Sequence, residues 1–140
     1  MVTSVQKSLV QESFALIAPI GEDLAALFYE RLFELDPAQR RLFKEDLIPQ
    51  RRKLAQMLTA AVKGLDRPEQ LIPVVQDLGR RHVAYGVADE HYDTVGAALL
   101  WSLQRVLGRA FTPQVEDAWA TVYGLLATTM KDAMKEPVPA

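Results

Sequence analysis

His82 lies on an apolar stripe whose members recur at helical spacing, a pattern that could place an imidazole in a buried site. The stripe comprises Leu71, Val75, Leu78, His82 and Tyr85. An imidazole on an apolar helix face is a side chain with which proteins hold haem iron from one side. A lone histidine on such a face is more often a core residue whose ring nitrogens bond to neighbours, and spacing alone leaves both interpretations open.

A second apolar stripe begins with a polar residue and could face the first. It comprises Gln50, Leu54, Met57, Leu58 and Ala61. The residues for other kinds of site are missing. The chain has no cysteine and only two histidines, His82 and His91, so it cannot assemble a metal cluster. It also has no glycine-rich phosphate loop and no nucleophile-elbow motif of a hydrolase. Haem needs a single protein ligand and an apolar cleft, which two such helices could supply.

Length and charge limit the classes of protein to consider. We expect the 140 residues to form a single domain over 1–140. The net charge is −2 and the basic residues are scattered, so we expect no nucleic-acid partner. No stretch approaches the roughly twenty apolar residues that span a bilayer, and the first residues do not read as a secretion signal. We expect a cytoplasmic protein without a membrane partner.

Hydrophobic periodicity of about 3.6 residues predicts an all-α domain. A first helix carries Val10 and stops near Pro19. The later expected segments are a helix over 24–35, a short turn over 37–42, a corner over 43–49, a helix over 50–64, the His82 segment after Pro68, a long helix between Gly86 and Gly108, a last helix from Pro113 capped by Thr112, and a frayed tail over 136–140. Gly79 costs about 1 kcal/mol in a helix interior, which predicts a bend or a close approach there.

Three parts of the chain together carry a family resemblance. They are residues 28–33 with Pro37 and Leu42-Phe43, then Gln50 with Leu54, and then LIPVVQDLGRRHVAYGVADEHYDTVG around His82. This pattern resembles bacterial single-domain haemoglobins akin to the globin half of flavohaemoglobins. It covers nearly the whole chain, and it implies a globin fold that binds haem b (iron protoporphyrin IX).

The resemblance implies a role for each matching residue. His82 corresponds to the proximal iron ligand, Phe43 to the aromatic residue on the haem face, and Tyr29, Gln50 and Leu54 to the distal trio. A phenol and an amide can donate hydrogen bonds to a diatomic ligand with partial negative charge, so Tyr29 and Gln50 are the candidate catalytic residues. From spacing alone, each of these residues also has a purely structural interpretation. Tyr29 would be a core tyrosine bonded to a backbone carbonyl, Gln50 a solvated residue of the first helical turn, and Phe43, as readily as a cofactor contact, a hydrophobic residue that fills the space under the corner.

Further residues are expected around the cofactor. Lys53 is a candidate partner of a haem propionate, and five apolar residues, each equally an ordinary core residue by periodicity, are expected to line the pocket: Leu78, Val87, Val95, Leu99 and Leu126. In flavohaemoglobin-type globins a tyrosine and a glutamate stand behind the proximal histidine. Tyr92 matches the tyrosine, but Met134 aligns with the glutamate, which predicts a less basic histidine and weak peroxidase chemistry.

The resemblance implies reversible oxygen binding, with nitric oxide dioxygenation as the expected activity. The expected ligands are dioxygen, NO and CO, and turnover would require a separate reductase because 140 residues leave no room for a flavin domain. Oxygen storage or delivery, gas sensing, and a cofactor-free helical interaction domain are the alternatives. The chain is expected to be a monomer or a homodimer.

Overall fold

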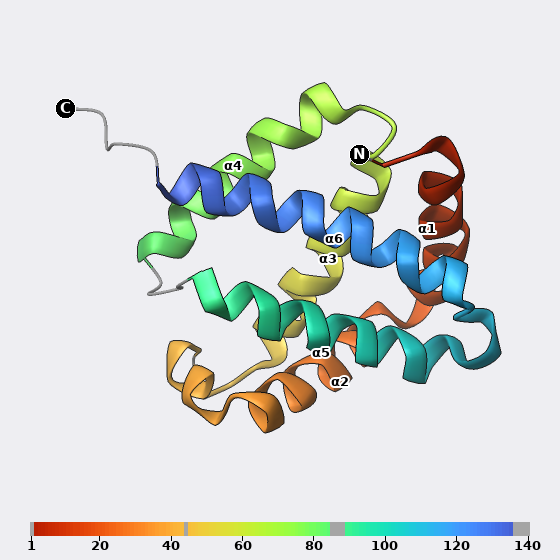
Figure 1. Ribbon diagram of the computed structural model, residues 1–140. Coiled ribbons are helices and arrows are strands. Elements are labelled where there is room, and N and C mark those ends of the chain that lie inside the picture. Colours follow the sequence, from red (N-terminus) through yellow and green to blue (C-terminus); the bar gives the residue numbers. More distant parts are fainter. Residues whose placement is uncertain (1, 44, 85–88, 136–140) are drawn as a thin grey trace.

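The described part of the chain is built of helices, and no strand occurs within it. The computed structural model describes residues 2–43, 45–84 and 89–135 (Figure 1). In chain order the elements are α1 (Ser4–Ile17), η1 (Ala18–Ile20), α2 (Gly21–Leu35), η2 (Pro37–Leu42), α3 (Ile48–Gly64), α4 (Pro68–Ala84), α5 (Asp89–Leu107), η3 (Gly108–Ala110) and α6 (Pro113–Met134), where η marks a 3₁₀ helix. The predicted all-α class is confirmed.

Helix boundaries fall where local chemistry satisfies the end groups of the helix. The Thr112 hydroxyl accepts a hydrogen bond from the Val115 amide at 3.2 Å, and Pro113 occupies the first turn of α6, as predicted. At the other end of the chain, Thr3 and Gln6 exchange two bonds, one from each backbone amide to the other's side chain. This reciprocal capping box starts α1.

The start of α3 differs from the prediction. The helix begins at Ile48 and not at Gln50, so the corner after η2 is shorter than expected. The Ile48 amide donates to the Asp46 carboxylate at 3.1 Å, and Pro49 then suits the first turn. Gln50 consequently lies in that first turn, where its side chain faces the neighbouring helix α2.

The packing of the helices brings α4 and α5 into position. Helix α6 runs alongside α4 and also contacts α1, whereas α5 packs against α2 (Figure 1). A Cβ added to Gly79 of α4 would lie 2.5 Å from the Met130 carbonyl oxygen of α6. Of the two explanations for Gly79, a bend or a close approach, the close approach is therefore the one observed. It lets α4, the helix that carries His82, pack closely against α6.

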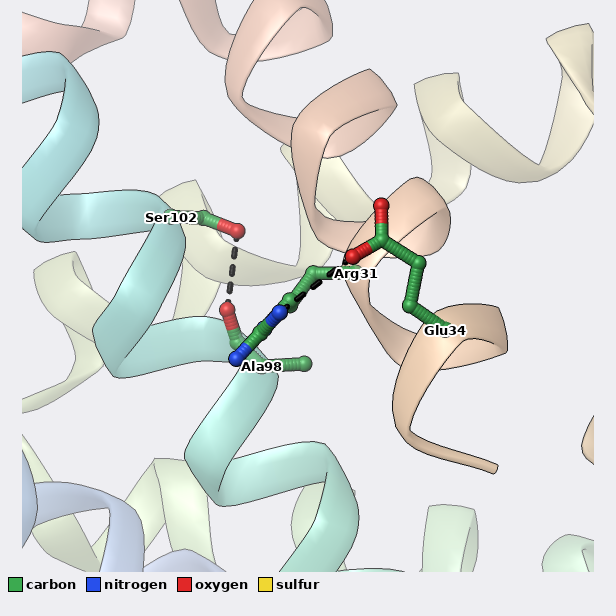
Figure 2. A network of polar contacts seen from close by, with 4 residues as sticks. All are labelled: Arg31, Glu34, Ala98 and Ser102. Carbon is green, nitrogen blue, oxygen red and sulfur yellow. Dashed lines mark hydrogen bonds and ion pairs between the residues drawn. The ribbon is translucent and has the colours of Figure 1, made fainter. Parts of the chain in front are cut away.

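The interface between α2 and α5 contains polar side chains from both helices. Figure 2 shows Arg31 on α2, and Ala98 and Ser102 on α5, the helix against which α2 packs. Its guanidinium pairs with Glu34 at 3.2 Å and lies 5.0 Å above the Trp101 ring, a cation–π contact between the two helices. Ser102 is fully buried and donates to the Ala98 carbonyl at 2.8 Å, so its hydroxyl is satisfied within α5.

The core spans all six α-helices. Its fully buried large side chains are Val10, Ile17, Leu24, Leu32 and Leu103. Within the described ranges, no helix combines the length and the apolar character needed to cross a membrane. The predicted frayed tail, residues 136–140, lies outside the described residues.

Candidate functional site

Tyr29 of α2 is the centre of an aromatic group beside the corner after η2. Its ring is 3 % exposed and meets Phe43 edge-on, with centroids 5.4 Å apart. Phe33 lies 5.6 Å from Phe43 and 6.0 Å from Tyr29 by the same measure. The corner therefore directs Phe43 inward onto Tyr29, and this position is compatible with both of the roles considered for Phe43.

The Tyr29 side chain is hydrogen-bonded to the side chain of Gln50. Burial raises the pKa of the Tyr29 hydroxyl above its usual value, and the bond with Gln50 lowers it by less. The hydroxyl stays protonated, and its own hydrogen can be donated to another acceptor.

Two further predicted residues follow Gln50 on α3. Leu54 is half-buried one turn later and packs against the core, whereas the Lys53 side chain is exposed. We call Tyr29, Phe33, Phe43, Gln50 and Leu54 the distal cluster. It combines an aromatic wall with two polar groups held side by side.

His82 lies in the last turn of α4, with its Nδ1 atom 3.0 Å from the Tyr92 hydroxyl of α5. Burial, with a smaller contribution from the charge of Arg81, lowers the pKa of His82 below its usual value. The imidazole is therefore neutral at neutral pH, which is the form that coordinates iron. Because Nδ1 bonds to Tyr92, Nε2 is the nitrogen suited to a metal.

Tyr92 is 3 % exposed, and its hydroxyl donates to the Met134 Sδ atom of α6 at 3.0 Å. We call His82, Tyr92 and Met134 the proximal relay. Met134, which aligns with the glutamate of flavohaemoglobin-type globins, thus contacts Tyr92.

Sequence reasoning did not single out the residues that hold Tyr92 in place. The Tyr123 hydroxyl of α6 donates to the Tyr92 carbonyl at 2.6 Å. The Tyr123 ring packs against Gly96 of α5 so closely that a Cβ added to Gly96 would lie 2.7 Å from the nearest ring atom. Burial raises the pKa of Tyr123 well above its usual range, so this donor stays protonated. A glycine inside the α5 helix was the available sequence signal for this packing.

The expected pocket-lining residues are placed differently from one another. Val95, Leu99 and Leu126 pack in or against the core, and the first two lie on α5 close to Tyr92. Leu78 is partly buried one turn before His82. Val87 lies outside the described residues, so the structure gives no position for it.

The donor set fits haem. The proximal relay offers one neutral imidazole, and the distal cluster offers an aromatic face with two hydrogen-bonding groups. A hollow of about 760 Å³ lies elsewhere, between η1 and α3, and none of the predicted site residues lines it. Its lining includes the exposed ion pair of Arg52 with Glu22, a surface that does not suit a flat apolar cofactor.

Known proteins are similar to this chain in sequence and in fold. A flavohemoprotein of Bordetella parapertussis is 37% identical over 91% of this chain, and one of Bacillus subtilis is 33% identical over 85%. The chain spans about a third of the length of these relatives, 32% and 31% respectively. The solved structure of a bacterial globin from Campylobacter jejuni matches with a TM-score of 0.85 and 28% identity, over 95% of this chain and 96% of that one.

The family profile described as Globin matches residues 26–130, a stretch that contains both the distal cluster and the histidine of the proximal relay. The match covers well over half of the chain. The chain belongs to the globin family.

Proposed function

We propose that this globin holds haem b with His82 as the axial ligand of the iron and binds dioxygen reversibly. The observation that supports the proposal is the 3.0 Å contact between His82 Nδ1 and the Tyr92 hydroxyl, which orients the ring so that Nε2 is the nitrogen suited to the metal. Phe43 would pack on the haem, Leu78, Val95, Leu99 and Leu126 would enclose it, and Lys53 would approach a propionate from the exposed side.

Tyr29 and Gln50 are the residues that we assign to the diatomic ligand. Gln50 lies beside the Tyr29 hydroxyl, and burial keeps that hydroxyl protonated, so its hydrogen can be donated to a partly negative ligand such as dioxygen. In a site that excludes water, such a bond contributes about 1–3 kcal/mol. This corresponds to about one to two decades in oxygen affinity, and Leu54 keeps water away from the same space.

The activity that we propose is nitric oxide dioxygenation, supported by the similarity to proteins named flavohemoproteins. The haem would supply the redox chemistry by which NO, dioxygen and one electron give nitrate. We assign the electron supply to a separate reductase, with residues 1–140 acting as a single globin domain, as a monomer or a homodimer in the cytoplasm. The residues of this chain bind and orient the gas and hold the proton on Tyr29.

The test is to load the purified protein with haem and to record absorption spectra of the oxidised, reduced, oxygen-bound and CO-bound forms. NO consumption is then followed with NADH and a flavin reductase. We expect reversible oxygen and CO spectra, and nitrate formed in proportion to NADH consumed. Reversible gas binding without nitrate would exclude the dioxygenase and leave storage or delivery, and failure to take up haem would refute the proposal.

A further inference from the structure

Met134 gives the proximal relay a chemical feature that the proposed ligation does not by itself require. Its sulfur accepts a hydrogen bond from the Tyr92 hydroxyl at 3.0 Å, and the same hydroxyl lies 3.0 Å from His82 Nδ1. Tyr92 is almost fully buried, and its backbone is anchored by the Tyr123 hydroxyl. The three side chains therefore form a fixed chain from α6 through α5 to α4.

The thioether favours one direction for the hydrogen bonds in this chain. A thioether sulfur carries no hydrogen, so it can only accept, and the Tyr92 hydroxyl has a single hydrogen to give. With that hydrogen directed at Met134, the hydroxyl oxygen accepts toward His82. The hydrogen of the His82 ring then lies on Nδ1, and the lone pair lies on Nε2.

We propose that Met134 is a positioning residue that fixes this tautomer and keeps His82 a neutral ligand of modest basicity. The inference rests on the proposed ligation of haem by His82. A thioether is uncharged and cannot take up a proton, so it adds no negative charge behind the histidine, as a carboxylate would. Weak electron donation favours reversible binding of dioxygen over cleavage of the O–O bond of a peroxide.

The surroundings of Met134 make the proposal testable by substitution. The residue is partly exposed in the last turn of α6, and the Lys131 ammonium lies 5.6 Å above the Tyr92 ring. A glutamate at position 134 would lie three residues after Lys131 on the same helix, within reach of a favourable charge pair. We therefore expect Met134→Glu to fold.

The experiment compares the unmodified protein with Met134→Glu, Met134→Gln and Met134→Leu, all loaded with haem. Thr128→Glu, at an exposed position of α6, is the control for added charge. Resonance Raman spectra of the reduced, ligand-free proteins give the iron–histidine stretching frequency, and spectroelectrochemistry gives the midpoint potential.

We expect the iron–histidine frequency to rise in the order Leu, then Met and Gln together, then Glu. Met134→Gln supplies a neutral acceptor and should keep the iron–histidine frequency of the unmodified protein. Met134→Leu removes the acceptor, so the Tyr92 hydroxyl can rotate away from position 134. For Glu we expect the potential to fall by at least about 59 mV, the value for a tenfold change in a one-electron equilibrium. Thr128→Glu should leave the frequency unchanged and move the potential by less than half that value.

Two outcomes separate this inference from the proposed function. A band at one frequency in all five proteins would overturn the role of Met134 and leave haem ligation intact. Absence of an iron–histidine band in the unmodified protein would overturn the ligation itself.

Discussion

The contact between Gly79 and the backbone of Met130 makes a quantitative prediction about how α4 is held. A Cβ at position 79 would lie 2.5 Å from the Met130 oxygen, 2.8 Å from its Cα and 3.0 Å from its carbonyl carbon. All three atoms belong to backbone, so no side chain can rotate away. Gly79→Ala therefore forces α4 off α6.

The magnitude follows from two opposing effects. Overpacking costs about 1–3 kcal/mol, and a clash with backbone belongs at the upper end of that range. Alanine in place of glycine in a helix interior stabilises the folded protein by about 1 kcal/mol. We expect a net loss of about 2 kcal/mol in the free energy of unfolding, with weaker haem retention because α4 carries His82.

Gly124→Ala is the matched control. Gly124 also lies inside a helix, but a Cβ there meets nothing within 4 Å. Only the propensity effect applies, so this variant should gain about 1 kcal/mol. Denaturant unfolding of the three proteins gives the free energies, and haem transfer to an acceptor globin gives the retention. A Gly79→Ala protein as stable as Gly124→Ala would refute the packing account.

Tyr29→Phe should speed oxygen release roughly 5- to 150-fold, the equivalent of 1–3 kcal/mol, while CO release changes much less because bound CO carries little negative charge. Stopped-flow ligand replacement measures both rates, and equal effects on the two gases would contradict the role of the hydroxyl. Thr112→Ala should lower the stability by about 1 kcal/mol because the Val115 amide loses its cap, with Thr112→Ser close to the unmodified protein in thermal unfolding. Gly108 has φ +54°, so Gly108→Ala should cost about 1–2 kcal/mol, and a neutral effect would count against the left-handed geometry.

Sequence pattern predicted the helices well where periodicity and end signals coincide. Thr112 and Pro113 define the start of α6 by their chemistry, and the structure places that start at the same residue. The start of α3 was predicted two residues late, since Ile48 is held by the side chain of Asp46, a contact that the apolar stripe from Gln50 does not reveal. Local signals of this kind set boundaries, whereas periodicity sets only the body of a helix.

The candidate site was predictable only in part. His82 stood out because an imidazole on an apolar stripe is unusual, but its bond to Tyr92 crosses from α4 to α5 and came from the family resemblance. Tyr123 was missed because it acts on a backbone carbonyl 31 residues away in sequence. Contacts between helices depend on how those helices pack, which no single stripe encodes.

The proposed function requires that His82, and not the nearby His91, binds the haem iron. The most direct measurement is the absorption spectrum of haem-loaded His82→Gly and His91→Gly, each recorded with and without added imidazole. We predict that His82→Gly loses the spectrum of a histidine-ligated haem and regains it with imidazole, while His91→Gly matches the unmodified protein. An unchanged spectrum in His82→Gly, or loss and rescue in His91→Gly, would contradict the assignment.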